Sequence, residues 1–246
     1  MTDFFEKSTD TPDLSTISIL FCTPTGDGKY EREFVSSIFS TMKELERLGA
    51  RAQFANFPYC ADLALARAKL LGTFYRSEHT HMMWIDADMG WKPQDVVRLV
   101  LHEKDYIGAA GPKKKYPLEF AANNIDEHGS PIPCIFEGTE LIEIAEVGLA
   151  FILMSRECVS RMVNCYESLE FNGGNDTKEY ALFDPIILNG RRLSEDFAFA
   201  RRWQKIGGKI HLIPDIRLTH TGAHKFEGAL SDLFTEENLY HEPKAA

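Results

Sequence analysis

Two aspartates, Asp86 and Asp88, stand one residue apart directly after the apolar run Met82–Ile85. Alternate side chains of an extended segment point the same way, so both carboxylates are expected to face one site with Ala87 turned away. Neighbouring carboxylates repel each other unless a cation lies between them. Mg²⁺ and Mn²⁺ are hard cations that join carboxylates to phosphate oxygens. The pattern indicates either a divalent-metal site or a turn whose acids favour the dipole of the next helix.

A second set of reactive side chains lies far along the chain. Glu195 and Asp196 follow Ser194, which is a good N-cap, at the start of a predicted helix. They could act as acid or base, or simply complement the helix dipole. His220 ends a later predicted strand, two residues before Gly222, and is either a metal ligand or a hydrogen-bonded strand-end histidine.

Basic side chains occur at two places where an anion could bind. Arg67 and Lys69 lie early in a predicted helix that follows a strand, where they would meet a phosphate or form a solvated helix face. Lys113, Lys114 and Lys115 follow another predicted strand and could meet a diphosphate, although a solvated loop is expected for at least two of them.

Strands and helices alternate over the first half of the chain and would position these groups. Residues 31–48 repeat apolar side chains at three- and four-residue steps, which predicts an amphipathic helix. Further helices are predicted at 61–72, ended by Gly72, and at 93–103, begun by Pro93; strands are predicted at 16–24, 52–57, 81–86 and 105–111. This alternation predicts an α/β fold with a mostly parallel central sheet flanked by helices.

The alternation breaks after residue 112, where loops and short antiparallel strands are expected up to 145. We predict a strand at 146–154, a helix at 155–166, loops at 167–192, a helix at 194–207 and one or two strands at 209–220. The expected organisation is a flexible leader at 1–15, a single domain at 16–222 and a C-terminal tail at 223–246.

Composition narrows the class of protein. The chain has 246 residues, of which 44% are hydrophobic and 26% charged, an ordinary globular balance. Its formal net charge of −10 disfavours broad binding to nucleic acid or anionic membrane. The five cysteines form no CxxC pair, the start lacks the pattern of a signal peptide, and no apolar run is long enough to span a membrane. We expect a soluble cytoplasmic protein.

The order of the short motifs resembles that of a known family. The chain contains a Pro/Thr loop after the first strand, an "AR" helix, a strand ending in "DAD", the segment "VGLAFILMSRE", an "SED" helix and a strand ending in "HTG". This series resembles the GT-A fold of nucleotide-diphospho-sugar transferases, particularly family 2-like glycosyltransferases. The resemblance covers roughly residues 16–222, and the family's usual downstream membrane helices are missing.

The resemblance implies roles for particular residues on the donor side. Thr23, Pro24 and Thr25 would hold the nucleoside, and Arg67 would contact the nucleotide. Asp86 matches the first acid of the DxD motif, near the ribose or the metal. The donor would be a nucleotide-diphosphate sugar, with UDP-sugar as the family-level expectation.

The resemblance also implies the metal and the base. Asp88 and His220 would coordinate Mn²⁺ or Mg²⁺, which neutralises the diphosphate leaving group. Asp196, with Glu195 beside it, matches the "ED" pair whose second acid takes a proton from the acceptor hydroxyl in inverting members. The activity implied is that of a hexosyl- or pentosyltransferase.

Other functions remain open at this point. A dehalogenase-type phosphatase also ends a strand in DxD, but Met89 and Gly90 replace its usual following residues. A nucleotidyltransferase would carry a Gly-rich basic loop after the first strand, which "PTGDGKYERE" resembles only faintly; a non-catalytic nucleotide-sugar binder would not need a base. The acceptor could be a glycan, a protein or a hydroxymethylated DNA base. Because of Arg191 and Arg192, DNA remains a possible acceptor, although the net charge disfavours DNA binding.

Overall fold

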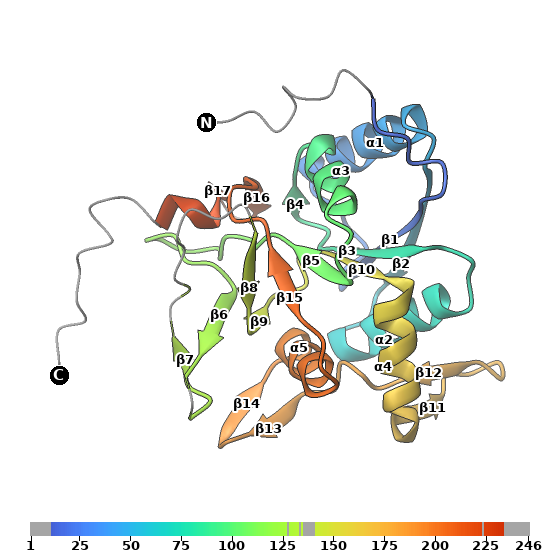
Figure 1. Ribbon diagram of the computed structural model, residues 1–246, viewed down its shortest axis with the longest axis vertical. Helices are drawn as coiled ribbons and strands as arrows, with labels where there is room; N and C mark the ends of the chain where they lie inside the picture. The colour runs from blue at the N-terminus through green and yellow to red at the C-terminus, as the bar shows by residue number, and fades with distance from the viewer. Residues whose placement is uncertain (1–10, 127, 133, 135–140, 223, 234–246) are drawn as a thin grey trace.

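A seven-stranded sheet forms the centre of the part of the chain that the structure describes (Figure 1). The structure is a computed structural model and describes residues 11–126, 128–132, 134, 141–222 and 224–233. The strands are, in spatial order, β2 (Arg51–Pro58), β1 (Ser18–Thr25), β3 (His81–Ile85), β10 (Phe151–Ser155), β5 (Tyr106–Gly108), β15 (Ile210–Leu212) and β8 (Ile142–Ile144).

Most of these strands run in one direction. β1 is parallel to β2 and β3, and β5 is parallel to β15. β10 is antiparallel to both β3 and β5, so the two parallel groups point the same way on either side of it. β8 is antiparallel to β15 at the edge. The predicted mostly parallel sheet is confirmed, with β10 and β8 as the reversed strands.

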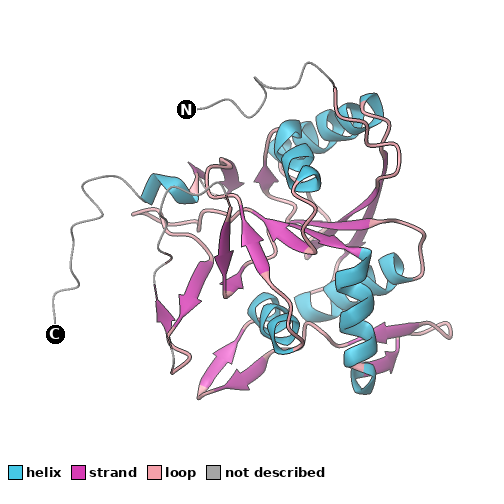
Figure 2. Ribbon diagram, in the orientation of Figure 1, coloured by secondary structure: helices cyan, strands magenta, loops and turns pink. Residues whose placement is uncertain are grey.

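Helices cover both faces of the sheet, as predicted (Figure 2). α1 (Arg32–Arg47) and α3 (Pro93–Leu101) pack on one face, and α2 (Leu63–Tyr75), α4 (Arg156–Cys165) and α5 (Glu195–Lys205) pack on the other. The side chains of the central strand β3 alternate between the two faces of the sheet, so β3 contributes to the hydrophobic core on each face. Met83 and Ile85 join the core under α1 and α3, whereas Met82 and Trp84 join the core under α2, α4 and α5.

The predicted end of the second helix at Gly72 is wrong, because α2 continues to Tyr75. An added Cβ at Gly72 would collide with the carboxylate of Glu179, which is 2% exposed and pairs with Arg76 at 3.1 Å. The glycine is therefore present for close packing between α2 and β12 (Lys178–Tyr180), and it does not end the helix.

The second half of the chain contains more strands than predicted. The segment 146–154 is two strands in different sheets, because β9 (Glu146–Val147) ends before a turn that leads into β10. β9 pairs with β6 (Ala122–Ile125), which also pairs with β7 (Pro131–Ile132). The expected loops at 167–192 contain the short helix η1 (Glu167–Leu169) and two hairpins, β11 (Glu170–Asn172) with β12 and β13 (Ile186–Leu188) with β14 (Arg191–Leu193).

A small three-stranded sheet lies beside the end of β3 and positions the late histidine. It consists of β4 (Met89–Gly90), β16 (Leu218–Thr221) and β17 (Lys225–Gly228), with Met89 opposite His220. β17 and the short helix η2 (Leu230–Leu233) belong to the segment expected as a tail, whereas residues 1–10 of the expected leader lie outside the described ranges. None of the described helices has both the length and the apolar character needed to cross a membrane.

Candidate functional site

The DAD segment forms a turn after β3, not the extended segment predicted from its alternation. The amide of Met89 donates to the carbonyl of Asp86, which closes the turn, and the carbonyl of Ala87 accepts from the amide of Glu31. The two carboxylates therefore diverge. Asp86 contacts a buried arginine, and Asp88 contacts residues of β16 and of the loop that follows β5.

Asp88 and His220 meet across the pairing of β4 with β16. Asp88 Oδ1 lies 3.2 Å from His220 Nε2, but it is buried and makes no hydrogen bond to any described residue. His220 Nδ1 lies 2.7 Å from the carbonyl oxygen of Pro112, which can only accept, so Nδ1 carries a proton. In the neutral ring this leaves the Nε2 lone pair on the side of Asp88. A histidine fixed in this way by a backbone carbonyl is suited to bind a metal.

The surroundings shift the pKa values of Asp88 and His220 in opposite directions. Burial raises the pKa of Asp88, but interactions with His220 and Lys114 outweigh it, and the net pKa is lowered. For His220, burial lowers the pKa, whereas contacts with Asp88 and with the Pro112 carbonyl raise it, and the net pKa is raised. Within the described residues no group of three or more His, Cys, Asp or Glu side chains is arranged to hold a metal. A metal bound beside Asp88 and His220 would therefore need further donors from water or a ligand.

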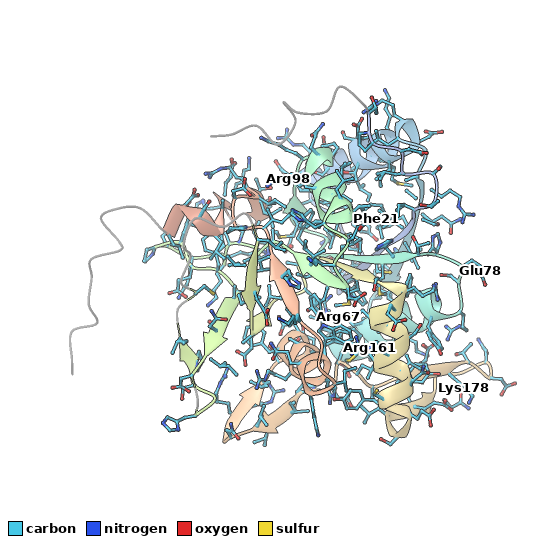
Figure 3. The ribbon with its side chains drawn as sticks, in the orientation of Figure 1. Phe21, Arg67, Glu78, Arg98, Arg161 and Lys178 are labelled. Atoms are coloured by element: carbon cyan, nitrogen blue, oxygen red, sulfur yellow. The ribbon has the colours of Figure 1, made fainter. Side chains whose placement is uncertain are left out.

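Arg67 connects the DAD turn to the start of α5. Its Nη2 lies 3.1 Å from Asp86 Oδ1, and its Nε lies 3.6 Å from Glu195 Oε1. The guanidinium is 2% exposed and lies over the ring of Trp84, 5.2 Å from the centroid. Figure 3 shows Arg67 deep in the molecule, between the sheet and α5. Asp86, predicted also as a metal ligand, is held in this ion pair and does not contact Asp88.

Asp196 lies in the first turn of α5, and one of its two carboxylate oxygens accepts hydrogen bonds. Its Oδ1 accepts from the hydroxyl of Ser194 and, at 2.7 Å, from the amide of Phe197. Its Oδ2 lies beside Gly148, where an added Cβ would be 3.3 Å away. Burial, and next the charge of Glu195, raise the pKa of Asp196. A half-buried carboxylate with a raised pKa, and with one oxygen that accepts no hydrogen bond from a described residue, is suited to general-base work.

A cavity of about 480 Å³ lies at the carboxyl end of β1. Pro24 and Thr25 line it from β1, and Asp86, Ala87 and Asp88 line it from the turn. Lys114, Thr221 and Gly222 complete the wall near His220. The hydroxyl oxygen of Thr25 is buried without a hydrogen-bond partner among the described residues. The carboxyl edge of a parallel sheet is the usual ligand site in such folds.

Not every predicted donor-side residue reaches this cavity. Thr23 is fully buried within β1 and does not line it, and neither do Arg67, Glu195 and Asp196. The predicted residues therefore form two groups. Pro24, Thr25, Asp86 and Asp88 line the cavity, with His220 beside Asp88. Glu195 pairs with Arg67, and neither it nor Asp196 lines the cavity.

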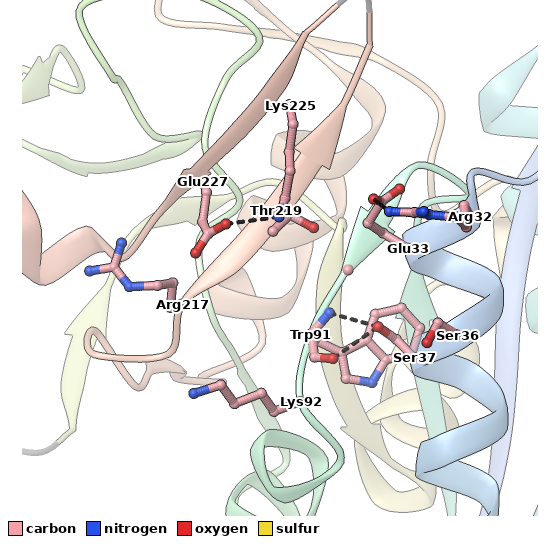
Figure 4. Close-up of a pocket in the computed structure, with 11 residues that line it drawn as sticks. Arg32, Glu33, Ser36, Ser37, Trp91, Lys92, Arg217, Thr219, Lys225 and Glu227 are labelled. Atoms are coloured by element: carbon pink, nitrogen blue, oxygen red, sulfur yellow. Dashed lines mark hydrogen bonds and ion pairs between the residues drawn. The ribbon is translucent and has the colours of Figure 1, made fainter.

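A second cavity, of about 580 Å³, lies near β4, β16 and the start of α1 (Figure 4). Its charges are largely paired. Arg32 pairs with Glu33 at 3.3 Å, Lys225 with Glu227 at 3.0 Å, and Arg217 with Asp232 at 2.8 Å. Although it is the larger of the two, it contains none of the predicted site residues.

Lys114 belongs to the candidate site, although the sequence did not distinguish it from Lys113 and Lys115. Lys113 and Lys115 pair with Glu119, whereas Lys114 contacts Asp88 Oδ2. No signal in the sequence separated them, because the segment bends, with the amide of Lys115 donating to the carbonyl of Lys113, and does not follow the alternation of a strand. Arg191 is one of the two arginines that left DNA possible as a partner. It forms two hydrogen bonds with the buried carboxylate of Glu146.

Comparisons with known proteins support the fold. No family model matches this chain, and no curated protein matches it. The crystal structure of A197 from STIV is similar, with a TM-score of 0.53 and 13% identity over 87% of this chain and 91% of that chain. At that identity the likeness shows a shared fold alone. A putative glucose-1-phosphate thymidylyltransferase from Bacillus anthracis, in complex with a sucrose, has a TM-score of 0.35 and 12% identity over 59% of this chain and 74% of that chain, too distant to support an argument.

Proposed function

We propose that this protein is a metal-dependent GT-A glycosyltransferase that moves a sugar from a nucleotide-diphosphate sugar to an acceptor hydroxyl. The observation that carries the proposal is the pairing of Asp88 Oδ1 with His220 Nε2, 3.2 Å apart, beside a cavity at the carboxyl edge of the sheet. A carboxylate and an imidazole from opposite halves of the chain supply the mixed O and N ligands that suit Mn²⁺.

The donor set fits a divalent cation bound together with a diphosphate. Asp88 Oδ1 is buried without a hydrogen-bond partner among described residues, and His220 is oriented by the Pro112 carbonyl. Asp88 and His220 would hold the metal, and diphosphate oxygens and water would complete its coordination. When bound, the metal acts as a Lewis acid that neutralises the charge of the departing nucleoside diphosphate.

The protein's own residues would bind the donor around this point. Pro24 and Thr25, at the end of β1, lie where the nucleoside of a UDP-sugar would enter the cavity. Arg67 holds Asp86 in place from the interior and so fixes the position of the turn that carries Asp88. The side chain of Arg67 acts through Asp86, because it does not itself line the cavity.

Asp196 would act as the base. Its free Oδ2 would take the proton of the acceptor hydroxyl while the acceptor oxygen bonds to the anomeric carbon and the bond to the diphosphate oxygen breaks. This single displacement inverts the anomeric centre. Gly148 leaves room beside Oδ2, where a side chain would crowd it. The net charge of −10 favours a glycan or another uncharged acceptor over DNA.

Release of nucleoside diphosphate from a panel of nucleotide sugars tests this proposal, with Mn²⁺ and with chelator. We expect turnover that requires Mn²⁺ and that Asp88→Asn abolishes. Activity that survives Asp88→Asn would overturn the metal assignment. Pyrophosphate release from a nucleoside triphosphate and a sugar phosphate, without turnover of nucleotide sugars, would instead identify a nucleotidyltransferase.

A further inference from the structure

The three consecutive lysines after β5 have different partners. Lys113 Nζ lies 3.2 Å from Glu119, and Lys115 Nζ lies 2.5 Å from the same carboxylate. Lys114 contacts Asp88 Oδ2 and lines the cavity at the end of β1. One of three adjacent ammonium groups is therefore placed inside the proposed site, and the other two are neutralised outside it.

The loop backbone fixes this arrangement. Pro112 and Phe120 form a bridge, and the amide of Lys113 donates to the carbonyl of Glu119 at 2.7 Å. The stem of Lys114 passes close to Gly222, where an added Cβ would lie 3.0 Å from Lys114 Cδ. The loop and the glycine together direct the ammonium of Lys114 to Asp88.

Asp88 therefore has a basic side chain beside each of its oxygens. Lys114 contacts Oδ2, and His220 lies 3.2 Å from Oδ1. A divalent cation at Asp88 would stand within a few ångströms of the Lys114 ammonium, and like charges at that distance repel each other. Close contact of both cations with the one carboxylate is therefore unfavourable.

We propose that Lys114 competes with the divalent cation for Asp88 and, when displaced, binds the diphosphate of the donor in the same cavity. This inference rests on the proposed function. Lysine suits the task because its ammonium is a compact charge on a flexible stem that can change partners without leaving the cavity. The cation and the diphosphate then bind cooperatively, because the diphosphate gives the displaced ammonium a new partner.

The test measures Mn²⁺ binding and UDP binding separately, by titration calorimetry, in wild type and in Lys114→Met, which keeps the length of the stem. We expect Lys114→Met to bind Mn²⁺ alone about fivefold or more tightly than wild type. With Mn²⁺ present at saturation, we expect it to bind UDP about fivefold or more weakly. A merely structural role would not change the two affinities in opposite directions.

Two controls sharpen the result. Lys113→Met removes a lysine that pairs with Glu119 and should leave both affinities unchanged. Lys114→Arg keeps the charge and should bind Mn²⁺ alone about as weakly as wild type. Folding of each variant is checked by its melting temperature.

The outcomes separate this inference from the proposed function. Mn²⁺ binding that depends on Asp88 and that Lys114→Met leaves unchanged or weakens would overturn the role of Lys114 and leave the metal site standing. Mn²⁺ binding that is absent in both wild type and Lys114→Met would overturn the metal site and this inference together.

Discussion

Asp88 Oδ1 and His220 Nε2 lie 3.2 Å apart, although one follows the central strand β3 and the other lies near the end of the domain. The pairing of β4 with β16 makes this contact, since it places Met89 opposite His220. The structure thus brings together two of the three residues predicted as metal ligands, whereas the third, Asp86, pairs with Arg67. Their coordination of a metal stays a prediction.

Removing the imidazole of His220 is expected to weaken metal binding selectively. His220→Asn should lower Mn²⁺ affinity about tenfold or more, in the range found when a ligand or its orienting partner is lost. His224→Asn is the matched control, because His224 is exposed and lies just beyond β16. Equal Mn²⁺ affinity in His220→Asn and wild type would exclude the imidazole as a ligand.

Transfer activity should depend on the ionisation of Asp196. Burial and the charge of Glu195 raise the pKa of Asp196, and a base must be ionised to accept a proton. Activity should therefore fall as pH decreases through a pKa above the ordinary aspartate value. Glu195→Gln removes the neighbouring negative charge, so kcat/KM should begin to fall at a lower pH than in wild type. If the acidic limb of the profile of kcat/KM against pH stays in place or moves to higher pH in Glu195→Gln, the assignment of Asp196 as the base is contradicted.

Arg67 should be important for stability as well as for the site. Arg67→Met removes the cation shared by Asp86 and Glu195 and leaves two partly buried carboxylates without it. Removing one partner of a buried ion pair leaves the other charge uncompensated, so we expect a loss of about 3 kcal/mol in the free energy of unfolding. Denaturant unfolding measures this, with the exposed Arg192→Met as control. A loss no larger than that of the control would show that the ion pairs contribute little.

Gly72 offers a test in which two effects oppose each other. Alanine in a helix interior normally stabilises by about 1 kcal/mol relative to glycine. At this position the added carbon would meet the buried carboxylate of Glu179, which Arg76 holds, and overpacking costs about 1–3 kcal/mol. We expect Gly72→Ala to destabilise the protein in denaturant unfolding, whereas the exposed neighbour Thr73→Ala should change little. Stabilisation by Gly72→Ala would mean that the Glu179 side chain moves aside freely.

The alternating half of the fold could be predicted because each element there has its own clear periodicity. The stripe of apolar residues in α1 and the apolar run of β3 each predict one element without knowledge of the rest. The hairpins within 167–192 could not be predicted, because strands of three residues are too short to show a period and depend on neighbours distant in sequence.

The sequence indicated the residue types of the candidate site but not their geometry. The sequence indicated Asp86 and Asp88 as one pair, whereas the turn after β3 sends them to different partners. That divergence depends on the hydrogen bond from Met89 to Asp86 and on Arg67, which comes from another element. The choice of Lys114 over its neighbours likewise depends on Glu119, which holds the other two lysines.

Nucleotide binding tests the central claim most directly. Thermal unfolding would be followed with a panel of nucleoside diphosphates, including UDP, with and without Mn²⁺, in wild type and in Asp88→Asn. We predict that one diphosphate raises the melting temperature of wild type strongly when Mn²⁺ is present and that Asp88→Asn loses this increase, because a ligand that binds the folded state stabilises it. An equal increase in Asp88→Asn, or no increase with any diphosphate and Mn²⁺, would contradict the proposed site.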